Sequence, residues 1–154
     1  MAGFLAFLIV MALAAIIYPA NEKDPFWSDS ARNLFVGLGL LVLETPELPQ
    51  TIGEILRQGS GKGYPVENYL KHVLAVRAAS ERPLSNACRE SLGRFLDNAE
   101  TTLKSIVGSF SAPLAVFGNP VIDKATSGDD FDLRDVRKKK MSIYLHIPAG
   151  EILQ

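Results

Sequence analysis

The chain has 154 residues, of which 47% are hydrophobic, and a formal net charge of −1. This length and hydrophobic content suit one domain with a sizeable buried core and exclude a wholly disordered chain. The near-neutral charge excludes a bulk polycation, so any contact with nucleic acid has to come from a local cluster of basic side chains.

The first 21 residues, MAGFLAFLIVMALAAIIYPAN, carry no charged side chain. Such a run reaches the lower limit of a membrane-spanning helix, roughly 17–25 residues. A helix buried in a larger protein is a second interpretation, and a cleaved signal peptide is a third that fits less well, because no Lys or Arg precedes the apolar run. We divide the chain into an apolar segment, 1–20, an all-helical domain, 21–126, and a connection with a strand, 127–154.

Two helices are predicted in the next part of the chain. The Asp-Pro pair at 24–25 is a good helix start, and the apolar run LFVGLGLLVL predicts a helix buried among others that extends to about Glu44. Thr51 and Glu54 stand at capping-box spacing, which predicts a short helix to about Arg57.

The segment GSGKG, 59–63, resembles the phosphate-binding loop of an ATPase at first sight. A phosphate-binding loop needs Gly where Leu56 stands and Ser or Thr where Gly63 stands, and it follows a buried strand. We therefore interpret GSGKG as a loop between two helices, with Lys62 exposed and mobile, and expect no ATP binding.

Apolar residues at helical spacing continue after this loop. They run from Val66 to Leu74 and again from Leu84 to Phe110, and the second run predicts one long helix or two helices with a break at 97–98. Cys88 falls on the apolar face of this second run, which predicts a buried thiol. A lone cysteine cannot form an internal disulfide, which favours a reducing compartment.

The last part of the chain changes in character. FGNPVIDKATSGDD, 117–130, predicts an irregular connection, and FDLRDVRKKK, 131–140, predicts a short helix. MSIYLHI, 141–147, is the clearest strand, and PLAVF, 113–117, is the one candidate partner for it. A strand with so little to pair with suggests that its sheet lies outside this sequence.

The candidate functional residues are basic. A cluster of Lys and Arg supplies the salt-dependent, sequence-independent part of DNA binding, although a solvated helix end is the plainer interpretation. We refer to this set as the basic cluster: Arg134, Arg137, Lys138, Lys139 and Lys140.

No metal site is expected. The acidic residues beside the basic cluster lack the spacing of a calcium loop and are better explained by helix capping and ion pairing. The two histidines are far apart and have no neighbouring ligands at metal-binding spacing. These residues are Asp129, Asp130, Asp132, Asp135, His72 and His146.

Four stretches together resemble one protein family. They are DPFW at 24–27, ARNLFVGLGLLVLETP at 31–46, TIGEILRQGSGKG at 51–63 and NPVIDKATSGDDFDLRDVRKKKMSIYL at 119–145. They are similar to the TraG/TraD-like coupling proteins of conjugative type IV secretion systems, which are hexameric inner-membrane ATPases that pump DNA. The last stretch is the most specific of the four.

The resemblance implies a mainly α fold: a helical bundle that is the all-α domain inserted into a motor domain, followed by one C-terminal strand that returns to a RecA-like sheet. The family's Walker A and Walker B motifs are absent from this sequence. We therefore expect a piece of a coupling protein that has no catalytic residue, no cofactor and no enzymatic activity of its own.

The resemblance also implies the partners and the location. We expect DNA or a relaxase–DNA complex and other type IV secretion components as partners, at the cytoplasmic face of the bacterial inner membrane, with hexamers only for the full-length protein. The alternative is a small stand-alone, membrane-anchored helical protein with a non-enzymatic binding role. Motor motifs encoded in the flanking DNA would favour the fragment.

Overall fold

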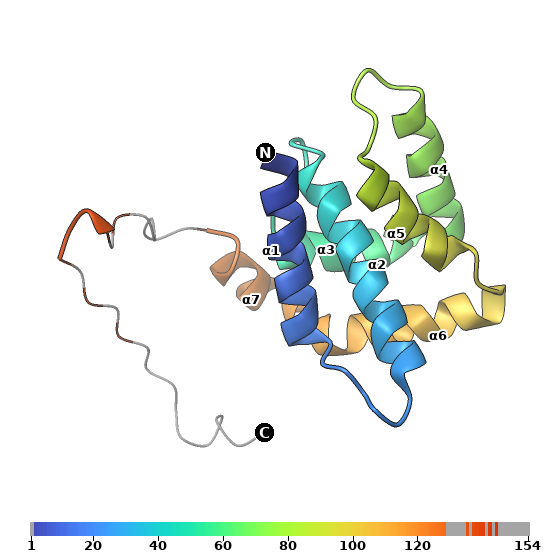
Figure 1. Cartoon of the computed structure of the whole chain (residues 1–154), viewed down its shortest axis with the longest axis horizontal. Helices are drawn as coiled ribbons and strands as arrows, with labels where there is room; N and C mark the ends of the chain where they lie inside the picture. Colours follow the sequence, from blue (N-terminus) through green and yellow to red (C-terminus); the bar gives the residue numbers. More distant parts are fainter. Residues whose placement is uncertain (1, 129–134, 136, 141, 143, 145–154) are drawn as a thin grey trace.

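The structure is a computed structural model that describes residues 2–128, 135, 137–140, 142 and 144. In this part of the chain the regular elements are helical, in the order α1 (Ala2–Ile17), α2 (Pro25–Leu43), α3 (Ile52–Gly59), η1 (Gly61–Gly63), α4 (Val66–Ala78), α5 (Asn86–Leu96), α6 (Glu100–Ser111), η2 (Ala112–Gly118) and α7 (Pro120–Ala125). Figure 1 shows α1 beside α2, α4 beside α5, and α6 crossing one end of α2. The predicted helical bundle is confirmed.

The predicted C-terminal elements lie largely outside the described residues. Of the strand predicted at 141–147, only Ser142 and Tyr144 are described, and both are exposed. The short helix predicted at 131–140 is described in part. The return to a sheet and the domain boundaries at 20 and 126 therefore stay predictions.

Helix α2 forms the centre of the bundle, as its apolar sequence predicted. Every residue of 34–42 is buried, and α2 contacts α1, α3, α5 and α6. A Cβ atom on Gly37 would lie 2.7 Å from Leu92 Cδ2 in α5, and one on Gly39 would lie 2.7 Å from Val10 Cγ1 in α1. These two glycines let α5 and α1 pack directly on the α2 backbone. Burial of each large side chain there contributes about 1.5–3 kcal/mol.

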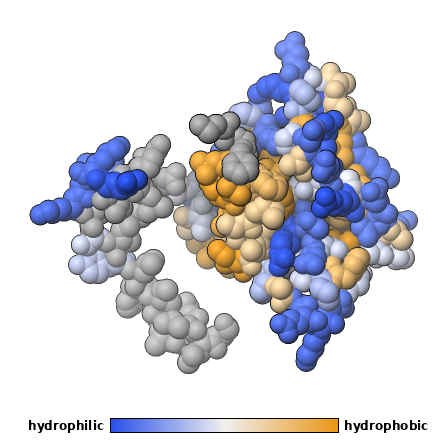
Figure 2. Space-filling view, viewed as in Figure 1, coloured by the Kyte–Doolittle hydropathy of each residue, from blue (hydrophilic) through white to orange (hydrophobic). Residues whose placement is uncertain are grey.

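Helix α1 packs one side against the bundle and leaves the other exposed. Val10, Ala14 and Tyr18 are buried, and the Tyr18 hydroxyl donates a hydrogen bond of 2.6 Å to the backbone oxygen of Phe110. Among the described residues, no helix combines the length and the apolar character needed to cross a membrane. Figure 2 shows an apolar patch over α1, to which we refer as the α1 face: Leu5, Leu8, Ile9, Met11, Leu13 and Ile16.

Several local predictions are confirmed. The backbone N–H of Glu54 donates to Thr51 Oγ1 at 3.1 Å, so Thr51 caps α3. The break predicted at 97–98 separates α5 from α6. Cys88 is fully buried, and this burial raises the pKa of its thiol to about 12, so the thiolate nucleophile does not form at neutral pH.

Three local predictions are corrected. Residues 113–117 belong to the 3-10 segment η2 and not to a strand, because Leu114 packs into the helical core. The connection predicted to be irregular contains α7, which the side chain of Asn119 caps by accepting from the N–H of Val121 at 2.9 Å. Asp24 stands at the start of α2, but its side chain makes no capping hydrogen bond.

Candidate functional site

The described members of the basic cluster are exposed. Arg137, Lys138, Lys139 and Lys140 all present their side chains to solvent, whereas Arg134 lies outside the described residues. The Nζ atoms of Lys139 and Lys138 lie 3.2 and 3.8 Å from the carboxylate oxygens of Asp135. These surface ion pairs are weak, so a phosphate group can replace the carboxylate at small cost.

Four basic side chains against one carboxylate leave this short segment with an excess of positive charge. Long, exposed Lys side chains reach phosphates without a fixed geometry, and each phosphate they neutralise releases a counterion. The expected acidic neighbour Asp135 forms ion pairs, while Asp129, Asp130 and Asp132 lie outside the described residues. Within the described residues, no group of three or more potential metal ligands comes together.

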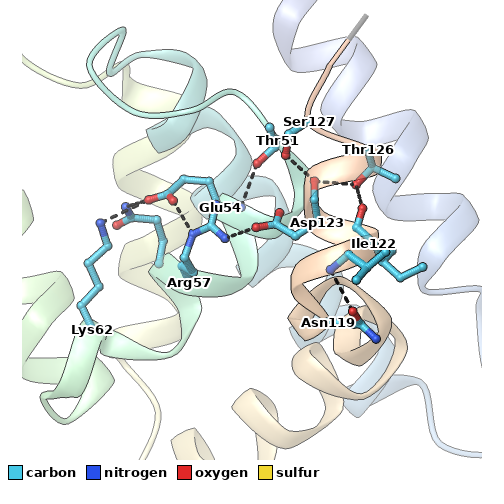
Figure 3. Close-up of polar contacts among 11 residues, drawn as sticks. Thr51, Glu54, Arg57, Lys62, Asn119, Ile122, Asp123, Thr126 and Ser127 are labelled. Carbon is cyan, nitrogen blue, oxygen red and sulfur yellow. Dashed lines mark hydrogen bonds and ion pairs between the residues drawn. The ribbon is translucent and has the colours of Figure 1, made fainter.

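A second polar site lies on α3 and joins it to the GSGKG loop (Figure 3). Glu54 is only 4% exposed, and its carboxylate accepts from Arg57 Nε at 2.7 Å, from Gln58 Nε2 at 2.7 Å and from Lys62 Nζ at 3.2 Å. We refer to Glu54, Arg57, Gln58 and Lys62 as the α3 network. Its donors compensate a carboxylate that folding removes from water.

The pKa of Glu54 reports this compensation. Burial by itself would raise the pKa of the carboxyl, but the hydrogen bonds from Arg57, Gln58 and Lys62 outweigh burial and hold the pKa below its usual value of 4.5. Glu54 is therefore charged at neutral pH, although it is buried. The hydrogen bonds that Arg57 donates to Glu54 and Asp123 raise the pKa of Arg57 above its ordinary value.

The α3 network also fixes the position of α7. Arg57 Nη1 donates to Asp123 Oδ2 at 2.6 Å, across 66 positions of sequence. The hydroxyls of Thr126 and Ser127 donate to the backbone oxygens of Ile122 and Asp123 at the end of α7. The segment that leads toward the basic cluster thus leaves the bundle from a helix that is tied to α3.

Lys62 is exposed, as the sequence predicted, but it also forms an ion pair with buried Glu54, which the sequence did not predict. Its backbone has a φ of 50°, between Gly61 at 72° and Gly63 at 93°. This conformation favours glycine, and the two glycines allow the chain to turn sharply between α3 and α4. The interpretation of GSGKG as a connection between two helices is confirmed.

Three members of this site were missed from sequence. Gln58 stands four residues after Glu54, so helical spacing could have paired them. Tyr69, whose hydroxyl donates to Gln58 Oε1, was placed only on an apolar stripe. Asp123 gives no sequence signal, because its partner comes from a distant helix.

The comparisons with known proteins give the family of the chain. A protein-family model described as type IV secretory system conjugative DNA transfer matches residues 9–153. The chain belongs to this family. No curated protein and no solved structure matches the chain.

Proposed function

We propose that this chain is a DNA-facing interaction module of a coupling protein in a type IV conjugative transfer system. The observation that carries the proposal is the basic cluster, in which four described side chains are exposed and two of them, Lys138 and Lys139, pair with Asp135. Family membership supplies the ligand class, since the family's description is DNA transfer. The partner is DNA itself or a relaxase bound to DNA.

The contact is electrostatic and independent of base sequence. Lys and Arg side chains neutralise phosphates, whereas base reading needs amide or guanidinium groups placed on an element that enters a groove. The basic side chains of the cluster follow one another in the sequence, which suits contact along a flexible single strand. The role of the bundle is to present this segment at a fixed exit from α7.

The chain performs this role without hydrolysing ATP. Supporting observations are that Lys62 is engaged by Glu54 at 3.2 Å and that the loop follows helix α3. Mg²⁺-dependent ATP turnover that disappears in Lys62→Ala would contradict this part of the proposal.

The chain works at the cytoplasmic face of the inner membrane, with the α1 face toward lipid. The support for this location is that α1 carries six large exposed apolar side chains and no charged residue. Apolar side chains of this kind can enter the boundary between headgroups and acyl chains without spanning the bilayer. The same feature favours the alternative function, a small stand-alone, membrane-anchored helical protein with a non-enzymatic binding role.

The test is fluorescence anisotropy of a labelled single-stranded DNA with purified chain. Changing Lys138, Lys139 and Lys140 together to Ala should weaken binding at least tenfold at low salt, because three phosphate contacts are lost. The matched control changes Arg89, Arg94 and Lys104, which are exposed on α5 and α6, and removes the same number of positive charges. Equal affinity of the parent and the lysine variant would refute the proposal.

A further inference from the structure

An open groove runs along α4, the helix that Figure 1 shows on the opposite side of the bundle from α7. It consists of two adjoining hollows that share Tyr69 and His72. One hollow, of about 400 Å³, is completed by Tyr64 and Asn68. The other, of about 290 Å³, includes Lys62 and Arg77 in its wall. We refer to these six residues as the α4 groove.

The floor of the α4 groove is fixed before any ligand arrives. The Tyr69 hydroxyl donates to Gln58 Oε1, and Gln58 is only 1% exposed. Gln58 in turn donates to buried Glu54 at 2.7 Å. The α3 network therefore holds the ring of Tyr69 in place. A ligand that packs on this ring does not have to order it, so binding costs little side-chain entropy of Tyr69.

The mouth of the groove carries an exposed aromatic ring. Tyr64 is 71% exposed, immediately before α4, and its backbone N–H donates to the oxygen of Gly61 at 3.0 Å. His72 is exposed on α4, and Asn68, one turn earlier, adds an amide. Aromatic rings beside an amide offer stacking faces together with hydrogen-bond donors and acceptors, which suits a planar heteroaromatic ligand.

The charge of the wall favours an anion. Of the described residues that line the two hollows, Lys62 and Arg77 are cationic and none is acidic. Lys62 already pairs with Glu54 at 3.2 Å, so Arg77 is the cation that a ligand would meet. Arg77 donates to three neutral oxygens, Thr45 Oγ1 at 2.8 Å and the backbone oxygens of Glu44 at 2.9 Å and Arg82 at 3.1 Å, so none of these contacts is an ion pair. A ligand that combines planar bases with negative charge fits the groove, because the bases can meet Tyr64 and the negative charge can meet Arg77.

We infer that the α4 groove binds single-stranded nucleic acid, with a base stacked against Tyr64 and an adjoining phosphate beside Arg77. The choice of ligand rests on the proposed function, but the site is separate from the basic cluster. The α4 groove would add a stacking contact, which only an unpaired base can make, to the electrostatic contact of the basic cluster. A duplex keeps its bases stacked internally and gains nothing from Tyr64.

The test measures binding of a short labelled oligothymidine to the full chain. Tyr64→Ala should weaken binding about tenfold, whereas Tyr64→Phe keeps the ring and should bind like the parent. Phe26→Ala, which removes an exposed ring from α2, is the matched control and should also bind like the parent. An abasic strand of the same length should not distinguish Tyr64→Ala from the parent, since it has no base to stack.

Each other outcome has a defined meaning. Equal affinity of Tyr64→Ala and the parent for oligothymidine overturns this inference, and the proposed function stands if the lysine variant still loses affinity. Binding that depends on Tyr64 but not on the lysines supports the groove and refutes the basic cluster. A chain that binds no single strand at low salt overturns both. An effect of Tyr64→Ala on an apolar peptide alone would make the groove a peptide site and also overturn the inference.

Discussion

Glu54 is a carboxylate that folding withdraws from water and surrounds with Arg57, Gln58 and Lys62. Its depressed pKa links folding to pH. The unfolded carboxyl, with its pKa near 4.5, takes up a proton before the folded one does, so the stabilisation is complete above 4.5. It is lost as the pH falls through the lower pKa of the folded state.

We therefore predict that Glu54→Gln is less stable than the parent at neutral pH and that the difference narrows at pH values below 4.5. Removing the charge takes a partner from Arg57 and Lys62, but their side chains are 44% and 41% exposed, so we expect a loss of only about 1 kcal/mol. Urea unfolding at both pH values gives the two free energies. Glu81→Gln, on an exposed carboxylate, is the control. A stability difference that does not change with pH would mean that the carboxylate's charge is irrelevant to folding.

For single residues, the sequence predicted the roles that depend on neighbours close by in the chain. Thr51 and Cys88 were placed correctly, because capping and helical periodicity operate within one turn or one face. The ion pairs of Lys62 and Asp123 were missed, because they depend on partners that the folding of the chain brings close.

The packing of α5 on α2 depends on the absence of a side chain at Gly37. A Cβ there would lie 2.7 Å from Leu92 Cδ2 and 3.2 Å from the Leu92 backbone nitrogen, so the buried leucine cannot simply rotate away. We predict that Gly37→Ala destabilises the chain by about 1–3 kcal/mol through overpacking, despite the better helix propensity of Ala.

Gly93 in α5 provides the matched control, because a Cβ at that position meets nothing within 4 Å. Gly93→Ala should raise the free energy of unfolding by up to about 1 kcal/mol through helix propensity alone. Thermal or urea unfolding of the two variants separates the effects. If both alanines change stability in the same direction by the same amount, close packing at Gly37 is not what matters.

Long periodic segments were predictable as elements and short ones were not. The helices α2, α4, α5 and α6 bury an apolar face over several turns, so the pattern in the sequence repeats. PLAVF and PVIDKA are too short to show a period, and their helical form follows from packing against neighbours and from the Asn119 cap. Their contacts with α3, α6 and each other decide the outcome.

At the scale of the whole molecule, the α1 face places six large apolar side chains at the surface of the described bundle. Changing Leu5 and Ile16 to Ser should reduce binding of the chain to lipid vesicles about tenfold or more, since each loses an exposed apolar side chain that would enter the interface. Val116 and Val121, which are exposed elsewhere, changed to Ser form the control. Vesicle flotation gives the bound fraction. If the parent chain does not float with vesicles, the proposal that the α1 face contacts lipid is wrong.

The most direct test of the central claim is the salt dependence of single-stranded DNA binding. For a single strand, the logarithm of the binding constant falls with the logarithm of salt concentration with a slope of about −0.7 per phosphate contact. If Lys138, Lys139 and Lys140 each neutralise a phosphate, changing all three to Ala should make the slope less steep by about 2. A triple variant whose slope equals that of the parent would show that the chain meets DNA elsewhere, and the basic cluster would then be a solvated chain segment without a role in transfer.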